Sequence, residues 1–209
     1  MPGLDPGIHC AACTMDRRVK PGDDTVKKPN PLCLCGYKGG LQEANGRGVS
    51  DEMTKPRPPV LDPAEVEPKI GSSYPEPFQA PCAKRERRRL GDALGLTNFG
   101  VNLMRLPPGV ASSMRHWHSR QDEFVFVVSG EVVLVSDAGE QTLTAGMAAG
   151  FPAGKADGHQ LVNRSDGDAV VLEVGDRTAL DEVDYSDIDM LVRWVGGEER
   201  FVHKDGTPY

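Results

Sequence analysis

The 209-residue sequence lacks any apolar run of the roughly 18 residues that a membrane-spanning helix needs, and its N-terminus has no apolar segment of the kind found in secretory signals. Cysteine is scarce in most of the chain. Four of the five cysteines lie before residue 36, so they cannot supply a disulfide framework for the remainder. These absences predict a cytoplasmic protein in a reducing compartment, with no membrane partner.

A surplus of basic residues is also missing. There are 24 Lys and Arg residues against 31 Asp and Glu residues, which gives a formal net charge of -7. Because nucleic-acid phosphates are bound by concentrated Lys and Arg side chains, we expect no nucleic-acid partner. The dense basic run at residues 84–89 is interpreted as a solvated face or as a local partner for acidic surface groups.

Residues 1–52 sustain no period of two or 3.6 residues, and Gly and Pro interrupt them throughout. We expect a disordered tail there. The stretches MPGLDPGIH and MDRRVKPGDD resemble peptides produced when a common bacterial intergenic repeat is read as coding sequence. That resemblance implies a mis-annotated start, with Met53 as the biological one.

Four cysteines of this tail permit a zinc interpretation, because four thiolates bind zinc tetrahedrally and can fold a small module. The second pair is separated by one residue, which is closer than the usual paired-knuckle spacing and argues against such a site. The cysteines are Cys10, Cys13, Cys33 and Cys35.

Residues 53–95 are expected to form an N-terminal arm with the first strands. Asp62 followed by Pro63 predicts a short helix or turn near residues 63–69, since Asp caps helices and Pro starts them. Strand-like segments separated by turn residues follow, with no helical pattern between them. They cover residues 98–106, 112–118, 123–128, 131–136, 141–144, 159–163 and 169–174. The pattern predicts an all-β fold with a jelly-roll type barrel.

Two histidines and a glutamate stand at positions where strands would aim them inward. Side chains two apart on a strand share a face, so His116 and His118 would project together while Trp117 points away. Glu123 opens an apolar strand, where an unpaired inward carboxylate would be costly to bury. His159 begins a later strand and can face the same interior.

Three imidazoles and one carboxylate suit a single divalent ion such as Mn, Fe, Ni, Cu or Zn. An octahedral ion on four protein ligands would keep two positions for water or substrate. The sequence therefore predicts a metal site made of His116, His118, Glu123 and His159.

The same residues lie in two patterns that resemble the motifs of the cupin superfamily. The patterns are Gly109-x6-His116-x-His118-x4-Glu123-x6-Gly130 and Gly146-x5-Pro152-x-Gly154-x4-His159-x3-Asn163. Compared with the usual motifs, the Gly109 loop is one residue longer and the loop before His159 is two residues longer. The resemblance implies one cupin type-2 barrel over residues 96–175, the four metal ligands named above, and a homodimer.

Residues 176–209 are expected to add a C-terminal hairpin with a polar tail, which could cover an exposed edge of the barrel or of a second subunit. His203 lies there, outside both motifs, and is a poor ligand candidate. Within the barrel, Asn163 is expected to close a turn or secure a strand end by hydrogen bonding. Other residues near the motifs keep open assignments. Asn98, Asn102 and Gln160 are either cavity or surface residues, and Phe124, Phe126 and Phe151 are core or interface residues.

Two functions fit the predicted site. The first is a metal-dependent enzyme acting on a small carboxylate- or carbonyl-bearing molecule. The resemblance to the cupin superfamily implies a decarboxylase, a dioxygenase or an isomerase, and the short single barrel most resembles the small bacterial oxalate-binding and oxalate-decarboxylase-like cupins. The alternative is a protein that binds or senses such a ligand through the metal without turning it over. A purely structural metal is disfavoured, because structural sites usually close the coordination sphere with protein ligands. The sequence assigns no catalytic or substrate-binding residue. An ionisable group near the open metal positions would favour the enzyme.

Overall fold

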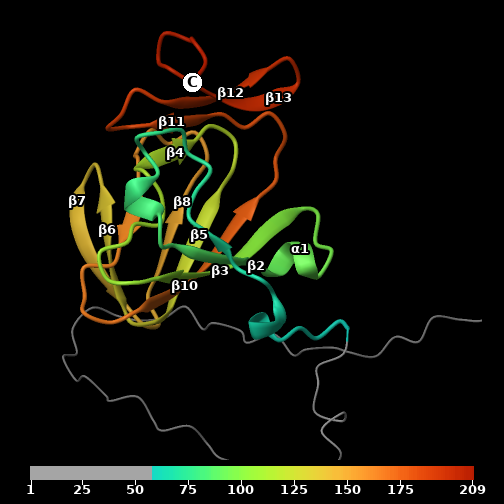
Figure 1. Cartoon of the computed structure of the whole chain (residues 1–209), viewed down its shortest axis with the longest axis vertical. Helices are drawn as coiled ribbons and strands as arrows, with labels where there is room; N and C mark the ends of the chain where they lie inside the picture. Colours follow the sequence, from blue (N-terminus) through green and yellow to red (C-terminus); the bar gives the residue numbers. More distant parts are fainter. Residues whose placement is uncertain (1–57) are drawn as a thin grey trace, which may run out of the picture. The chain divides into compact units, whose positions relative to one another are not determined.

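Strands dominate residues 58–209, the part of the chain that the computed structural model describes (Figure 1). These residues belong to one compact unit. No helix among them is long and apolar enough to cross a membrane. The predictions for residues 1–52 lie outside the described residues. They concern the disordered tail, the start at Met53 and the zinc interpretation of Cys10, Cys13, Cys33 and Cys35.

Hydrogen-bonded strands form three antiparallel sheets. The six-stranded sheet has the order β1 (Lys69–Ile70), β2 (Glu86–Arg89), β3 (Phe99–Leu106), β10 (Ala169–Asp176), β5 (Glu123–Ser129) and β8 (Ala148–Phe151). The three-stranded sheet is β7 (Gly139–Thr144), β6 (Glu131–Ser136) and β9 (Gln160–Val162). The four-stranded sheet is β13 (Glu198–Val202), β12 (Leu191–Val195), β11 (Val183–Tyr185) and β4 (His116–His118). Within residues 58–209, helical elements are limited to the 3₁₀ turns Pro63–Glu65 and Ala80–Cys82 and the helix α1 (Leu90–Ala93).

The main core lies between the inward faces of the six- and three-stranded sheets. On β5, Val125 and Val127 are buried, whereas their neighbours Phe124 and Val128 are 43% and 48% exposed, as the period of two requires. The buried cluster also includes Met104, Leu106, Val110, Val132, Leu143, Leu161, Ala169 and Val171. This arrangement confirms the predicted all-β fold of jelly-roll type. Phe124 is not a core residue, and the homodimer stays a prediction.

Six of the seven predicted barrel strands agree with the structure to within two residues at each end. The segment at 112–118 is strand only from His116. Before it, Ala111 bridges Val162 and the Ser112 amide donates to the Leu161 carbonyl. The chain there passes from the three-stranded to the four-stranded sheet, which shortens β4. Strand β8 was not predicted, because Ala and Gly have little strand preference.

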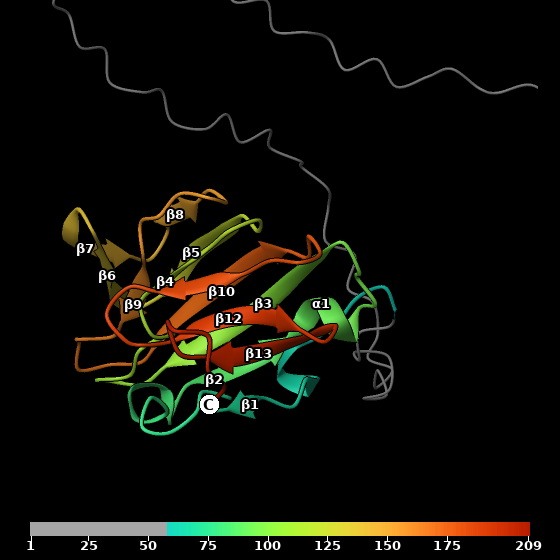
Figure 2. The ribbon, with the colours of Figure 1, turned by 90° about the horizontal axis from the view of Figure 1, so that it is seen from above.

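Both ends of the described chain behave as predicted. Asp62 accepts a hydrogen bond from the Ala64 amide at 2.9 Å and caps the 3₁₀ turn Pro63–Glu65. The C-terminal hairpin is β12–β13, turning at Gly196 and Gly197, whose φ angles of 66° and 90° favour glycine. Strands β11, β12 and β13 lie across one end of the sandwich, and β11 pairs with β4 (Figure 1 and Figure 2). These three strands, called the hairpin sheet below, therefore cover one edge of β4, the strand that carries His116 and His118.

Asn163 provides a stability test of the barrel. Its buried amide donates to the carbonyls of Leu106 and Gly167 at 2.7 Å, and its side-chain oxygen accepts from the Ser165 amide at 2.9 Å. Asn163→Ala leaves these buried groups short of partners, so we expect unfolding to cost about 2–3 kcal/mol less in chemical denaturation. The exposed Asn98 serves as control, and Asn98→Ala should change little. Equal stability of the two variants would contradict the assignment.

Candidate functional site

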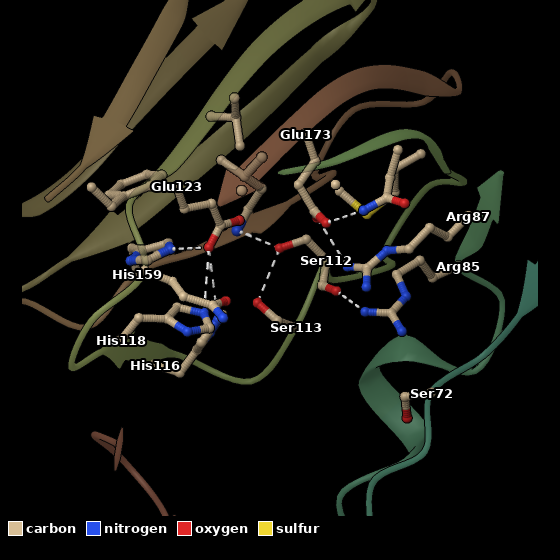
Figure 3. Close-up of a pocket in the computed structure, with 18 of the residues that line it drawn as sticks. Ser72, Arg85, Arg87, Ser112, Ser113, His116, His118, Glu123, His159 and Glu173 are labelled. Atoms are coloured by element: carbon tan, nitrogen blue, oxygen red, sulfur yellow. Dashed lines mark hydrogen bonds and ion pairs between the residues drawn. The ribbon is translucent and has the colours of Figure 1, made fainter. Parts of the chain in front are cut away.

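The four residues predicted as metal ligands lie together at one end of the six-stranded sheet (Figure 3). His116 and His118 share a face of β4, and His159 lies directly opposite His116, with which it exchanges two backbone hydrogen bonds of 3.1 and 2.9 Å. Glu123 opens β5 and points at the same group. The chain thus collects these side chains from three separate segments.

All three imidazoles face one carboxylate oxygen. Glu123 Oε2 lies 3.1 Å from His159 Nε2, 3.8 Å from His118 Nε2 and 3.9 Å from His116 Nε2. The ligand atoms of His116, His118 and Glu123 all lie within 4.8 Å of one another, which is close enough to hold one ion. His159 joins the group through its contact with Glu123.

Hydrogen bonds at Nδ1 fix the ring orientation and the tautomer of His116 and His118. His116 Nδ1 lies 2.9 Å from the Met114 carbonyl, which can only accept, so Nδ1 carries the proton. His118 Nδ1 lies 2.6 Å from the buried Asp181 carboxylate. With Nδ1 protonated, each Nε2 turns an unshared electron pair toward Glu123, as a metal ligand must.

Burial and neighbouring groups shift the pKa values of His116 and Glu123 in the direction that metal binding needs. Burial, together with the neighbouring histidines, lowers the pKa of His116 to about 4 and keeps its ring neutral near pH 7. Burial acts to raise the pKa of Glu123, but the His159 hydrogen bond and the nearby imidazoles outweigh it and lower this pKa to about 2. A neutral His116 ring beside an ionised Glu123 carboxylate suits the binding of a divalent cation.

Asp181 holds His118 in place and was not predicted from the sequence. Its carboxylate also accepts from the Arg120 amide at 2.7 Å and from the Ser119 hydroxyl at 3.2 Å, and its carbonyl accepts from Trp194 Nε1 at 3.0 Å. The C-terminal extension therefore supports a residue of the metal group directly. No local pattern marks Asp181, because it precedes β11 in a connecting segment.

Aromatic rings pack against two of the histidines. Phe151 stacks on His159 with ring centroids 3.5 Å apart and planes 1° from parallel. Tyr185, which pairs with His116 across β11 and β4, stacks on that ring at 5.7 Å. Phe151 also contacts the main core, so the predicted core role is correct but incomplete.

A cavity of about 420 Å³ adjoins the group, and inward-facing residues of β2, β3, β10 and β5 line it. Asn102 belongs to this lining, whereas Asn98 is exposed and Gln160 lies outside the lining. Gly100 and Gly175 pair in the same cross-strand row as Glu123. A Cβ atom on either would make only ordinary contacts, the nearest at 3.7–3.8 Å. These glycines therefore keep space open beside the carboxylate.

A second carboxylate, Glu173, enters the cavity from β10. It accepts from Arg87 Nη2 and Asn102 Nδ2, each at 2.9 Å. Glu173 pairs across the sheet with Val125, two residues along β5 from Glu123, so the two carboxylates are diagonal neighbours on one face. Glu173 was not predicted as a site residue. It is the single acidic residue within the apolar segment 169–174, and Glu123 was predicted from the same kind of pattern.

Two arginines of the basic run also line the cavity. Arg85 is only 7% exposed, and Arg87 lies on β2 with its side chain toward Glu173 (Figure 3). The interpretation of residues 84–89 as a solvated face is therefore wrong for these two residues, whereas the alternative of pairing with an acidic group holds for Arg87, whose partner Glu173 lies in the cavity. Their spacing of two, typical of one strand face, was the available signal.

Residues 102–175 match a family described as the cupin domain. A sugar phosphate isomerase from a cupin superfamily, from Silicibacter pomeroyi, is 50% identical, with a TM-score of 0.69 over 72% of this chain and 96% of that one. A protein of Acidithiobacillus ferrooxidans proposed to be a sugar phosphate isomerase is 28% identical, with a TM-score of 0.59 over 69% of this chain and 88% of its own.

A predicted oxalate decarboxylase from Thermotoga maritima is 21% identical, with a TM-score of 0.47 over 57% of this chain and 99% of that one. No curated protein matches the sequence. The identity to the Silicibacter pomeroyi protein over nearly its whole length, together with the cupin domain match, confirms the family that the two motifs indicated. This chain belongs to the cupin superfamily.

Proposed function

We propose that the protein is a divalent-metal-dependent enzyme that isomerises a small sugar phosphate. The observation that carries the proposal is the convergence of three imidazoles on Glu123 at one end of a polar cavity that contains a second carboxylate, Glu173. The 50% identical relative described as a sugar phosphate isomerase supports the choice of reaction. Decarboxylation and oxygenation, the other reactions expected of such a site, have no comparable support.

The metal would be held by His116, His118, Glu123 and His159, whose ring nitrogens all face Glu123 Oε2. When bound, such an ion supplies a Lewis acid that polarises a carbonyl or hydroxyl oxygen of the substrate. The hydrogen bonds of His116 to Met114 and of His118 to Asp181 hold the rings in the required orientation.

Glu173 is the group we assign to proton transfer. Interconversion of an aldose and a ketose moves one proton from the carbon beside the carbonyl to the carbonyl carbon and another between the two oxygens, with no net gain or loss of atoms. A carboxylate in the cavity beside the metal ligands can take the carbon-bound proton and return it to the neighbouring carbon. Hydrogen bonds from Arg87 and Asn102 fix the carboxylate in position for both transfers.

One observation favours the alternative function, a protein that binds or senses a ligand without converting it. The carboxylate oxygens of Glu173 are already engaged by Arg87 Nη2 and Asn102 Nδ2, each at 2.9 Å. A binding or sensing protein would use the same contact to hold a ligand through Arg87 without proton transfer.

The reaction can be followed by proton NMR in deuterium oxide. The full-length protein, loaded with Mn, Fe, Ni, Cu or Zn in turn, is incubated with aldose and ketose phosphates of three to six carbons. We expect interconversion of one pair with incorporation of solvent deuterium at the exchanging carbon, abolished by a chelator. Binding of these sugars without interconversion or exchange would support the alternative.

Asp181 supports the metal site through His118, which gives a separate prediction. Asp181→Asn keeps the size of the side chain but removes the charge that orients and polarises the imidazole, so we expect metal affinity to fall about tenfold to a hundredfold. Competition with a fluorescent chelator measures the dissociation constant. Asp189→Asn is the matched control. Asp189 also pairs with a histidine, His203, at 2.9 Å, but neither residue lines the cavity. Equal affinities in the two variants would refute a supporting role for Asp181.

A further inference from the structure

The end of the cavity away from the histidines carries two guanidinium groups (Figure 3). Arg85 immediately precedes β2, and Arg87 lies on it, so their spacing of two directs both toward the cavity. Arg89 continues the series at the cavity margin, where it is more exposed. One strand face therefore presents a row of cations to the same space as the metal ligands.

Arg85 is buried without an acidic partner among the described residues. Its terminal nitrogens donate to the carbonyl oxygens of Ser112 and Gly71, and its Nε has no hydrogen-bond partner. A buried cation that is compensated only by neutral carbonyls is costly, and a bound anion would offset that cost.

Arg87 does not supply the missing negative charge. It pairs with Glu173 at 2.9 Å, and its own Nε is buried without a partner. Burial first, and then the charge of Arg87, lower the pKa of Arg85, so the two cations are close enough to repel each other. Only Arg87 has a carboxylate partner among the described residues, so the charge of Arg85 is left without an ion pair at this end of the cavity.

Between the two ends lie the hydroxyls of Ser112 and Ser113, 3.2 Å apart (Figure 3). The Ser112 hydroxyl accepts from the Leu161 amide at 3.0 Å, and Ser113 can offer hydrogen bonds to a ligand. A cavity of about 420 Å³ falls within the range of small-molecule sites, and it is larger than a two-carbon acid would need. Its lining suits a ligand with oxygens for a metal at one end, hydroxyls in the middle and an anion at the other.

We propose that Arg85 and Arg87 form an oxyanion subsite that binds the phosphate group of the substrate, while the carbonyl end of the substrate reaches the histidine group. This inference rests on the proposed function and adds the residues that select a phosphorylated substrate. Guanidinium groups match phosphate oxygens with paired hydrogen bonds, and two of them can share a doubly charged anion. Arg87 would then serve both the phosphate and Glu173.

The test uses inorganic phosphate as the probe and the melting temperature of the full-length protein as the readout, before and after treatment with a chelator. Phosphate should raise the melting temperature of wild type without metal, because it binds only the folded state. In Arg87→Met, we expect the dissociation constant for phosphate to rise at least about tenfold, with metal content unchanged. Arg105→Met is the control, since Arg105 pairs with Glu86 and Asp168 outside the cavity lining.

Three outcomes would overturn the subsite: no stabilisation of wild type by phosphate, equal binding in Arg87→Met and wild type, or binding that requires metal. Acetate that stabilises as strongly as phosphate would overturn the phosphate assignment. Should Arg87→Met fail to fold, Arg87→Lys replaces it and must bind phosphate more weakly than wild type. A protein without metal would refute the proposed function, whereas the phosphate measurement would still decide the subsite.

Discussion

Replacing His116 and His159 together by alanine is expected to remove the metal from the protein. Wild type purified without added metal should carry about one divalent ion per chain, and the double variant should carry less than about a tenth of that. The reason is that the variant keeps only His118 and Glu123, which cannot enclose an ion. Elemental analysis by mass spectrometry measures the content directly.

The control for this experiment is His203→Ala. His203 pairs with Asp189 and stacks on Tyr209 in the C-terminal tail, so its loss should leave the metal content unchanged. Circular dichroism checks that each variant is folded. A well-folded wild type without metal would exclude the metal-dependent reaction proposed above. A double variant that keeps its metal would refute the assignment of His116 and His159 as ligands.

The metal group could be predicted because its pattern is mostly local. His116 and His118 are related by the strand period of two, and Glu123 follows within the same motif. His159 is distant in sequence, but it opens a strand with a motif of its own. The structure brings it against Glu123 through the pairing of His159 with His116.

The rest of the cavity could not be predicted in the same way. Glu173 and Arg87 are 86 residues apart, and they meet only because β3 lies between β2 and β10 in the sheet. Local periodicity shows which face a side chain occupies, but it does not show which strands become neighbours. Arg85 and Arg87 were not predicted as cavity residues, because they lie in a run of charged residues and such runs are usually solvated.

The contribution of the hairpin sheet to the site could not be predicted from the sequence either. A C-terminal hairpin could be predicted, and so could its use in covering an edge. Its contribution to the site depends on Asp181 and Tyr185, which reach His118 and His116 only through the register of β11 against β4. Strand register depends on long-range packing, which the sequence of the hairpin alone does not specify.

Glu173→Gln is expected to lower kcat for the isomerisation by about 10²–10⁴-fold, because an amide cannot take up the carbon-bound proton. KM should change little, since the amide oxygen can still accept from Arg87 or Asn102, and metal content should be that of wild type. Exchange of the substrate hydrogen with solvent deuterium should fall in parallel with kcat.

Glu86→Gln is the matched control, because Glu86 pairs with Arg105 on the same sheet but lies outside the cavity lining. Wild-type turnover in a metal-loaded Glu173→Gln protein would assign proton transfer to another group. Loss of substrate binding with unchanged kcat would reduce Glu173 to a binding residue.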